Sequence, residues 1–381
     1  MQLMKDYKRL GDYIREVNVR NRELEVTKLV GLTIDKAFIP SVANVIGTDL
    51  SNYKIIRKEQ FACSLMQVSR DGKMPVAMFE EDEAIMSPAY PMFEVVDKEI
   101  LLPQYLMMWF SRSEFDREAS YYAVGGVRGS LTWEDFCNMQ LPIPSITRQR
   151  EIVAEYETLT RRIRINEQMI QNLESTAQTL YRKMFVDGID KENLPEGWRM
   201  GTISDFCKEM KSGGTPSRNH NEYWNQDDYP WLKSGEVHNN IIVDVEEYIS
   251  EAGLKNSSAK IIPSGSVVMA MYGATAAQVA YLDCDTTTNQ ACCNMLCHSK
   301  EDAAYLFFHL LSNQEEIKKL ANGGAQENLS QELIAQQPII LLEDNKLKGL
   351  FVPILDNLVV RYKENSKLTE LQSLLLAKMG Q

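Results

Sequence analysis

The stretch EIVAEYETLTRRIRINEQMIQNLESTAQTLYRKM, residues 151–184, repeats apolar side chains at alternating intervals of four and three. This heptad pattern predicts one long helix whose apolar seam packs against another helix. A polar residue in the middle, Asn166, is the kind of interruption that fixes register and partner at a cost in stability. The seam comprises Ile152, Tyr156, Leu159, Ile163, Asn166, Ile170, Leu173, Ala177, Leu180 and Met184.

A second seam with the same register and length begins 195 residues after the first. We expect the two helices to pack on each other, although each could instead pack only on its neighbouring globular half. Polar residues again occupy the middle, which puts a fully apolar contact between the helices in doubt. This seam comprises Leu347, Phe351, Ile354, Leu358, Arg361, Asn365, Leu368, Gln372, Leu375 and Met379.

The segments around the two seams also correspond, so the chain reads as an internal repeat. GVRGSLTWEDFCNMQLPIP (126–144) matches GAQENLSQELIAQQPII (324–340), and YKRLGDYI at Tyr7 loosely matches WRMGTISDF at Trp198. The predicted order is globular domain 1–143, helix 144–192, globular domain 193–338 and helix 339–381. Mixed short strands and helices inside the halves make the fold class α+β.

One long uncharged segment, residues 261–282, could cross a bilayer by length alone. It contains Pro263, Gly265 and Gly273 together with polar residues, so we interpret it as two buried strands around a turn at residues 272–275.

Composition constrains compartment and partners. Seven scattered cysteines and a start without an apolar signal region predict a reduced, cytoplasmic protein. A formal net charge of −12 argues against indiscriminate nucleic-acid binding, so any DNA contact must come from local surfaces, with partners supplying some of the attraction.

Motifs for catalysis are absent from the sequence. There is no phosphate-binding G-x-x-x-x-G-K-[ST] loop, no G-x-G-x-x-G, no Asn/Asp-Pro-Pro-aromatic tetrapeptide of amino-methyltransferases and no HExxH. Cys292, Cys293, Cys297 and His298 cluster, but their spacing is more typical of small core residues than of zinc ligands. These observations favour binding over catalysis and predict no metal site.

Polar turns with interspersed cations and aromatics offer donors for phosphates and base edges. SGGTPSR, residues 212–218, lacks the lysine and the following helix signal of a nucleotide site, and we interpret it as part of such a surface. The DNA-contact candidates of the second half are Ser212, Gly213, Gly214, Thr215, Ser217, Arg218, Lys233, Lys260, Tyr272, Thr275, Asn289 and Gln290. Those of the first half are Thr33, Lys36, Tyr53, Lys54, Arg57, Arg70, Lys73, Tyr90 and Arg128. Each of these residues could equally serve a turn or a core.

The motif order resembles that of the specificity subunit of type I restriction-modification systems. The segments that carry the resemblance are LPEGW (194–198), SGGTPSR, YPWLKSGEV (229–237), SSAKIIPSGSVVMAMYGAT (257–275), TNQACC (288–293) and NLSQELI (328–334). The first half resembles a divergent second copy, with SPAYPMFEV (87–95) and LPIPSITRQREI (141–152). The resemblance covers nearly the whole chain.

This resemblance implies two target-recognition domains, each reading one half of a split DNA sequence, with an internal pseudo-twofold repeat. The two long helices would form an antiparallel coiled-coil spacer between them. Two modification subunits that carry S-adenosylmethionine and methylate adenine, and restriction subunits that use ATP and Mg, would join the chain, which itself would hold no cofactor.

Helix length is compatible with a spacer. At ~1.5 Å per residue a helix over 149–184 spans roughly 54 Å, which is about one and a half turns of B-DNA at ~3.4 Å per base pair. Where the second half has residues 211–215, the first has Asn18–Arg22 in a different sequence, so we expect the two halves to read different bases.

Two hypotheses of other classes stay open at this point. A stand-alone DNA-modifying or cleaving enzyme would need a methyl-donor or metal site, and a coiled-coil scaffold for other proteins would need globular halves without DNA affinity.

Overall fold

A computed structural model describes residues 7–41, 47–66, 68–124, 129–321 and 328–380. The chain divides into two compact units. Unit 1 consists of Met1–Arg162 together with Leu368–Gln381, and unit 2 is Ile163–Lys367.

Unit 1 is built on an antiparallel sheet of order β2-β9-β6-β7, with the smaller pairs β1-β10, β3-β4 and β5-β8. Its strands are β1 Tyr7–Arg9, β2 Ile14–Glu16, β3 Val30–Leu32, β4 Phe38–Pro40, β5 Lys54–Arg57, β6 Phe61–Cys63, β7 Val76–Met78, β8 Glu83–Met86, β9 Met92–Val95 and β10 Gln140–Pro142. Its helices are α1 Val68–Asp71, α2 Pro103–Phe110, α3 Ser113–Ala123 and α4 Trp133–Asn138, followed by the start of α5 Ile146–Phe185.

Aromatic side chains from the sheet and the helices form the core of unit 1. Phe61 and Phe93 stack across neighbouring strands with ring centroids 5.0 Å apart, and Phe110 of α2 and Phe136 of α4 close over them. Helix α2 begins at Pro103, where the missing amide hydrogen is not needed. This core fixes the surface loops that follow each strand.

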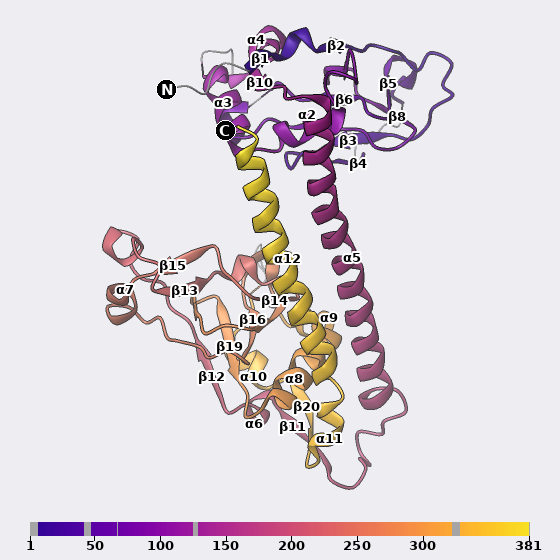
Figure 1. The fold of residues 1–381 in the computed structure, drawn as a ribbon. Coiled ribbons are helices and arrows are strands. Elements are labelled where there is room, and N and C mark those ends of the chain that lie inside the picture. Colours follow the sequence, from indigo (N-terminus) through magenta and orange to yellow (C-terminus); the bar gives the residue numbers. More distant parts are fainter. Residues whose placement is uncertain (1–6, 42–46, 67, 125–128, 322–327, 381) are drawn as a thin grey trace. The chain divides into compact units, whose positions relative to one another are not determined.

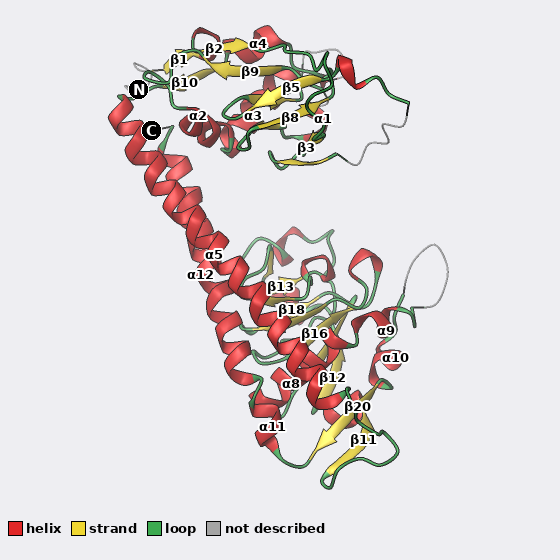
Figure 2. Cartoon of the chain, turned by 90° about the vertical axis from the view of Figure 1, so that its right-hand side faces the viewer, coloured by secondary structure: helices red, strands yellow, loops and turns green. Residues whose placement is uncertain are grey.

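Unit 2 contains a larger sheet of order β12-β19-β16-β17-β14 and a three-stranded sheet β15-β13-β18. Its strands are β11 Trp198–Thr202, β12 Glu209–Ser212, β13 Tyr229–Leu232, β14 Asn240–Ile242, β15 Glu247–Ile249, β16 Val267–Ala270, β17 Val279–Leu282, β18 Thr287–Thr288, β19 Cys292–Leu296 and β20 Pro338–Leu342. Its helices are α6 Ile203–Phe206, α7 Glu251–Lys255, α8 Lys300–Ser312, α9 Gln314–Lys318, α10 Gln331–Ala335, α11 Asn345–Gly349 and most of α12 Val352–Lys378. Helix α8 packs on β16 and β17 (Figure 2).

The prediction for residues 261–282 is confirmed. Strands β16 and β17 are buried and pair antiparallel, and the 3₁₀ turn Gly273–Thr275 lies between them. Within the described residues, no helix is both long and apolar enough to span a bilayer.

Topology confirms the internal repeat. The order β2-β9-β6-β7 of unit 1 recurs in unit 2 as β12-β19-β16-β17. Each half also begins with a strand that pairs antiparallel with the strand just before its long C-terminal helical segment: β1 with β10, and β11 with β20. Strand β20 runs across the predicted boundary at residues 338/339.

Helix α5 confirms the first seam. It is 40 residues long and runs as one continuous helix (Figure 1). All ten seam positions are buried or half-buried, while most of its other positions are exposed. In unit 2 its last turns also enter the globular core, where Tyr181 and Phe185 pack near Phe351 and Tyr305. The helix therefore contacts both α12 and its neighbouring core.

The second seam needs a correction, because it does not lie on a single helix. Leu347 belongs to the short helix α11, Phe351 lies between the helices, and α12 starts only at Val352. Pro353 explains the break. Proline has no amide hydrogen to donate and its ring clashes with the preceding turn, so it is tolerated in the first turn of a helix but not in the interior. Ile354, Leu358, Leu368 and Leu375 lie on α12 and are buried or half-buried, as predicted.

Polar residues of the second seam find polar partners on α5. In unit 2 the buried Asn166 donates its Nδ2 to Asn365 Oδ1 at 2.9 Å. In unit 1 Gln372 Nε2 donates to Thr160 Oγ1 at 2.7 Å. Within unit 2, Asn166 meets Asn365 and Tyr181 meets Phe351, so residue numbers rise along α5 as they fall along the facing segment and the helices are antiparallel.

Candidate nucleic-acid interface

The two glycines of SGGTPSR are packing residues. A Cβ on Gly213 would lie 2.2 Å from the Thr288 carbonyl oxygen, and one on Gly214 would lie 2.2 Å from Ser258 Oγ. The Gly214 amide donates to that same Thr288 carbonyl at 2.8 Å. Only glycine fits between these neighbours, so the turn is anchored inside unit 2 and presents its following residues outward.

Four separate loops of unit 2 converge in one polar surface, which we call the loop cluster: Thr215, Ser234, Thr275, Asn289 and Gln290. Thr215 Oγ1 donates to Gln290 Oε1. Thr275 Oγ1 donates to the Ser234 carbonyl at 2.9 Å, and Asn289 Nδ2 lies 3.5 Å from Ser234 Oγ. Four of the five are individual sequence candidates and Ser234 lies within the candidate stretch 229–235; the structure brings all five together.

Two further candidates lie on the strand ends beside this turn. Ser212, at the end of β12, donates to Gln331 Oε1 of α10 at 2.6 Å. Tyr272 is exposed and its backbone bridges to Asn328. Exposed Ser217 and Lys260 complete the predicted set of unit 2; the Ser217 carbonyl accepts from the indole of Trp224 at 3.2 Å.

Arg218 and Lys233 meet at Glu247, a residue that sequence reasoning missed. Arg218 Nη1 lies 2.6 Å from Glu247 Oε2 and Lys233 Nζ lies 3.1 Å from Oε1. The hydrogen bond from Arg218 holds the pKa of the Glu247 carboxyl below its usual value, so that carboxyl is charged. Glu246, at 2.7 Å, raises the pKa of Lys233.

Aromatic rings also hold Arg218. Its guanidinium carbon lies 3.5 Å from the ring centre of Trp224 and 5.1 Å from that of Trp231, an arrangement that favours a cation over an aromatic face. Trp231 Nε1 donates to the Gly214 carbonyl at 3.0 Å, so the turn, the rings and the guanidinium form one assembly. The sequence contained a signal for it, because the turn is followed by two tryptophans within 13 residues of Arg218.

Lys36 of unit 1 is engaged internally. It lies in the β3–β4 turn with a positive φ of 63°, its ammonium pairs with Asp116 at 2.9 Å and it donates to the Phe110 carbonyl. Burial lowers the Lys36 pKa. Thr33 closes the same turn through hydrogen bonds with Ala37.

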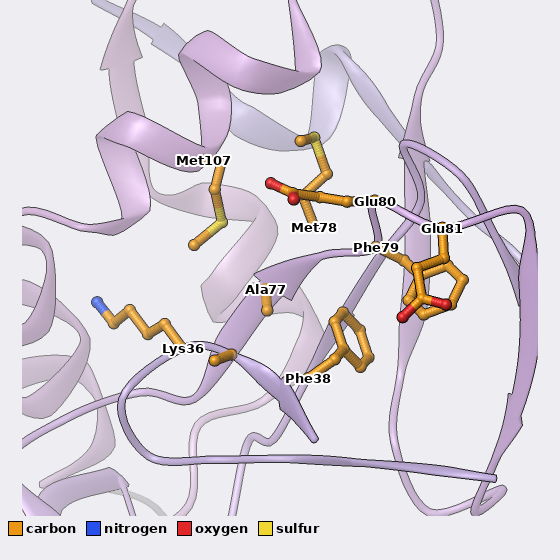
Figure 3. Close-up of a pocket in the computed structure, with 9 residues that line it drawn as sticks. Lys36, Phe38, Ala77, Met78, Phe79, Glu80, Glu81 and Met107 are labelled. Carbon is orange, nitrogen blue, oxygen red and sulfur yellow. The ribbon is translucent and has the colours of Figure 1, made fainter. Parts of the chain in front are cut away.

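Beside this turn lies a cavity of about 320 Å³ (Figure 3). The residues that line it are Lys36, Ala37, Phe38, Ala77, Met78, Phe79, Glu80, Glu81 and Met107. Figure 3 shows the Lys36 side chain extended away from Phe38 and from Glu81. With its cation turned away and two carboxylates in its wall, this cavity is unsuited to a phosphate.

The remaining candidates of unit 1 are scattered. Lys54 is buried and donates to the Tyr90 carbonyl at 2.8 Å, while Tyr53 is half-buried just before it. Exposed cations pair with nearby acids: Arg57 with Glu83 at 3.6 Å, Arg70 with Asp71 at 2.6 Å and Lys73 with Asp35 at 3.0 Å. Arg128 lies outside the described residues. Lys73 also lines, with Lys36, a cavity of about 340 Å³, so the candidates of unit 1 lie in small separate groups.

The cysteine cluster of unit 2 is part of the core. Cys292 and Cys293 are fully buried on β19, and burial raises the pKa of Cys292 to about 12. Among the described residues, no group of three or more His, Cys, Asp or Glu side chains is placed to hold a metal ion.

Comparison with known proteins finds one recurring similarity. Residues 195–371 match the type I restriction modification DNA specificity domain. The HindI specificity subunit of Haemophilus influenzae is 23% identical over 378 residues, covering 78% of this chain and 81% of that protein. The chain is thus similar to type I specificity subunits over most of its length.

Two further comparisons give the same similarity. The EcoR124I/EcoR124II specificity subunit of Escherichia coli is 23% identical, covering 66% of this chain and 64% of its own length. A crystal structure of the S subunit from M. genitalium has the same fold, with a TM-score of 0.58 at 14% identity over 100% of this chain and 97% of that one.

Proposed function

We propose that this chain is the non-catalytic DNA sequence-specificity subunit of a type I restriction-modification complex and that it reads a bipartite target with two domains. The observation that carries the proposal is the repeated strand order of the two halves, each closed by its own strand pair before a long helical segment. One chain thus holds two copies of the same framework with different surface loops.

Unit 2 offers a surface suited to duplex DNA. Its loop cluster provides hydroxyl and amide groups of the kind that contact phosphates and base edges, and Arg218 supplies a planar donor able to bind guanine in bidentate fashion. In unit 1 the segment that corresponds to SGGTPSR differs. There the buried Asn21 side chain donates to the Val26 carbonyl and accepts from the Val26 amide. We therefore expect the first half to read different bases.

The proposed partners are double-stranded DNA, two modification subunits and the restriction subunits. In this proposal S-adenosylmethionine, ATP and Mg are bound by those subunits and not by this chain. The acidic balance of the chain, −12, is then compensated by partners that share in holding the DNA.

A domain exchange tests the proposal. The chain is co-expressed with an adenine methyltransferase of the type I class, and methylated positions are mapped in the host genome. We expect a bipartite methylated motif, and exchange of residues 194–338 for those of a relative is expected to change one half of it and leave the other intact.

The control is the same exchange vector with the original residues restored. A stable complex that methylates no bipartite motif would contradict DNA specificity and favour the scaffold hypothesis. Alteration of both half-sites by the exchange would contradict independent reading by two domains.

A further inference from the structure

Two candidate DNA-contacting cations of unit 2 share a single carboxylate. The two oxygens of Glu247 are divided between Arg218 Nη1 at 2.6 Å and Lys233 Nζ at 3.1 Å. With Glu246 on the other side of Lys233, at 2.7 Å, two cations face two carboxylates and their formal charges cancel. A DNA phosphate approaching this surface therefore meets no net positive charge until Glu247 is displaced.

Glu247 is held in place by the backbone and not only by its ion pairs. It is the first residue of β15 and lies opposite Trp231 in the antiparallel register with β13. The Glu236 carboxylate accepts the amides of both Lys233, at 3.1 Å, and Glu246, at 2.9 Å. The segments that carry Lys233 and Glu247 are thus joined independently of the charges between them.

Arg218 likewise keeps its position without Glu247. Its guanidinium lies over Trp224, and the indoles of Trp224 and Trp231 both donate to the backbone of the turn, at the carbonyls of Ser217 and Gly214. Removing the negative charge of Glu247 would therefore expose a cation that is already placed, instead of releasing a mobile side chain.

We propose that Glu247 is an internal competitor for DNA phosphate, which neutralises Arg218 and Lys233 in the free chain and has to be displaced when DNA binds. The inference rests on the proposed DNA-reading function. It assigns to Glu247 the role of weakening the grip of unit 2 on any duplex, whatever its sequence. A phosphate has the same charge sign as the carboxylate and can accept from both cations at once.

The test uses Glu247→Gln in the complex co-expressed with the methyltransferase, with binding to a fluorescent random-sequence duplex measured as a function of salt. We expect the variant to bind about three- to tenfold more tightly near 0.1 M salt, with a log–log salt slope steeper by about one for each additional phosphate engaged. Glu251→Gln is the matched control, because it removes the same charge from the Lys255 pair at 2.7 Å, another ion pair of unit 2.

A double-mutant cycle assigns the effect to the cation. Arg218→Ala is expected to change binding of the random duplex little in the wild-type background, where the charge is neutralised, and to weaken it in the Glu247→Gln background. The inference would be overturned if Glu247→Gln and Glu251→Gln bound the duplex equally well, or if Arg218→Ala had the same effect in both backgrounds. Bipartite methylation by the wild-type chain would in that case still support the proposed function. Absence of bipartite methylation by the wild-type complex would instead sink the proposed function and the inference together.

Discussion

Replacing the buried Asn166 by leucine is expected to destabilise unit 2, because it leaves a polar partner without a hydrogen bond. Asn166 is fully buried; its Nδ2 donates to Asn365 Oδ1 at 2.9 Å, and its own Oδ1 accepts from Arg361 Nη1 at 3.4 Å. In Asn166→Leu the half-buried amide of Asn365 loses its partner, whereas Arg361 keeps Glu364 at 2.9 Å.

The size of the effect follows from these contacts. An unsatisfied buried amide costs ~1 to 3 kcal/mol, and the Arg361 bond at 3.4 Å is too long to add much, so we expect a loss of ~2 to 3 kcal/mol. For a unit of about 200 residues this corresponds to a fall in melting temperature of ~4 to 12 °C. Asn166→Leu with Asn365→Leu is expected to recover most of the loss, because two apolar side chains then face each other.

Differential scanning calorimetry of the unit 2 transition measures the change. Asn172→Leu, at an exposed position of the same helix, is the control and is expected to stay within ~0.5 kcal/mol of wild type. The reasoning would be refuted if Asn166→Leu were as stable as the wild-type chain, or if the double variant were less stable than the single one. The hydrogen bond between Asn166 and Asn365 would then not stabilise the pairing of the two helices.

Two further changes act inside unit 2. Gly213→Ala is expected to lower the free energy of unfolding in urea by ~2 kcal/mol or more, because its Cβ would lie 2.2 Å from the Thr288 carbonyl oxygen. The control Gly235→Ala, with no neighbour within 4 Å, should be nearly neutral. Equal effects of the two changes would show that packing does not select Gly213. Burial lowers the pKa of His309, next to Tyr181 and Asn313, from 6.5 to about 4. Between these pH values the unfolded chain binds a proton on His309 that the folded chain does not, so the free energy of unfolding should fall by up to ~3 kcal/mol as the pH drops from 6.5 to 4. His309→Gln should lose that part of the pH dependence in unfolding measured at both ends of this range, and an unchanged difference would exclude His309 as its source.

Periodic features of the sequence were predictable because they depend on local spacing. The heptad seam of α5 and the strand pair around residues 272–275 follow directly from such spacing. The late start of α12 was also readable, since Pro353 stands where a continuous helix would need an amide donor.

Contacts between distant segments could not be predicted in the same way. Lys36 pairs with Asp116, 80 residues away, and Arg218 pairs with Glu247, 29 residues away; in both cases the partner is chosen by sheet register and helix packing. The sequence around a lysine or arginine in a polar turn does not show whether its charge faces solvent or an internal carboxylate. The sequence therefore predicted polar turns at these positions but not the carboxylates that pair with their cations.

The discontinuous make-up of unit 1 has a consequence for synthesis on the ribosome. Its core includes Met379 and contacts Leu376, and the Tyr7 hydroxyl donates to the Gly380 carbonyl at 3.0 Å, so these contacts close only after residues 163–367 have been made. At ~5 to 20 residues per second, the 205 intervening residues delay that closure by roughly 10 to 40 s. During this interval the apolar surface of unit 1 that later receives Leu376 and Met379 is uncovered in the nascent chain.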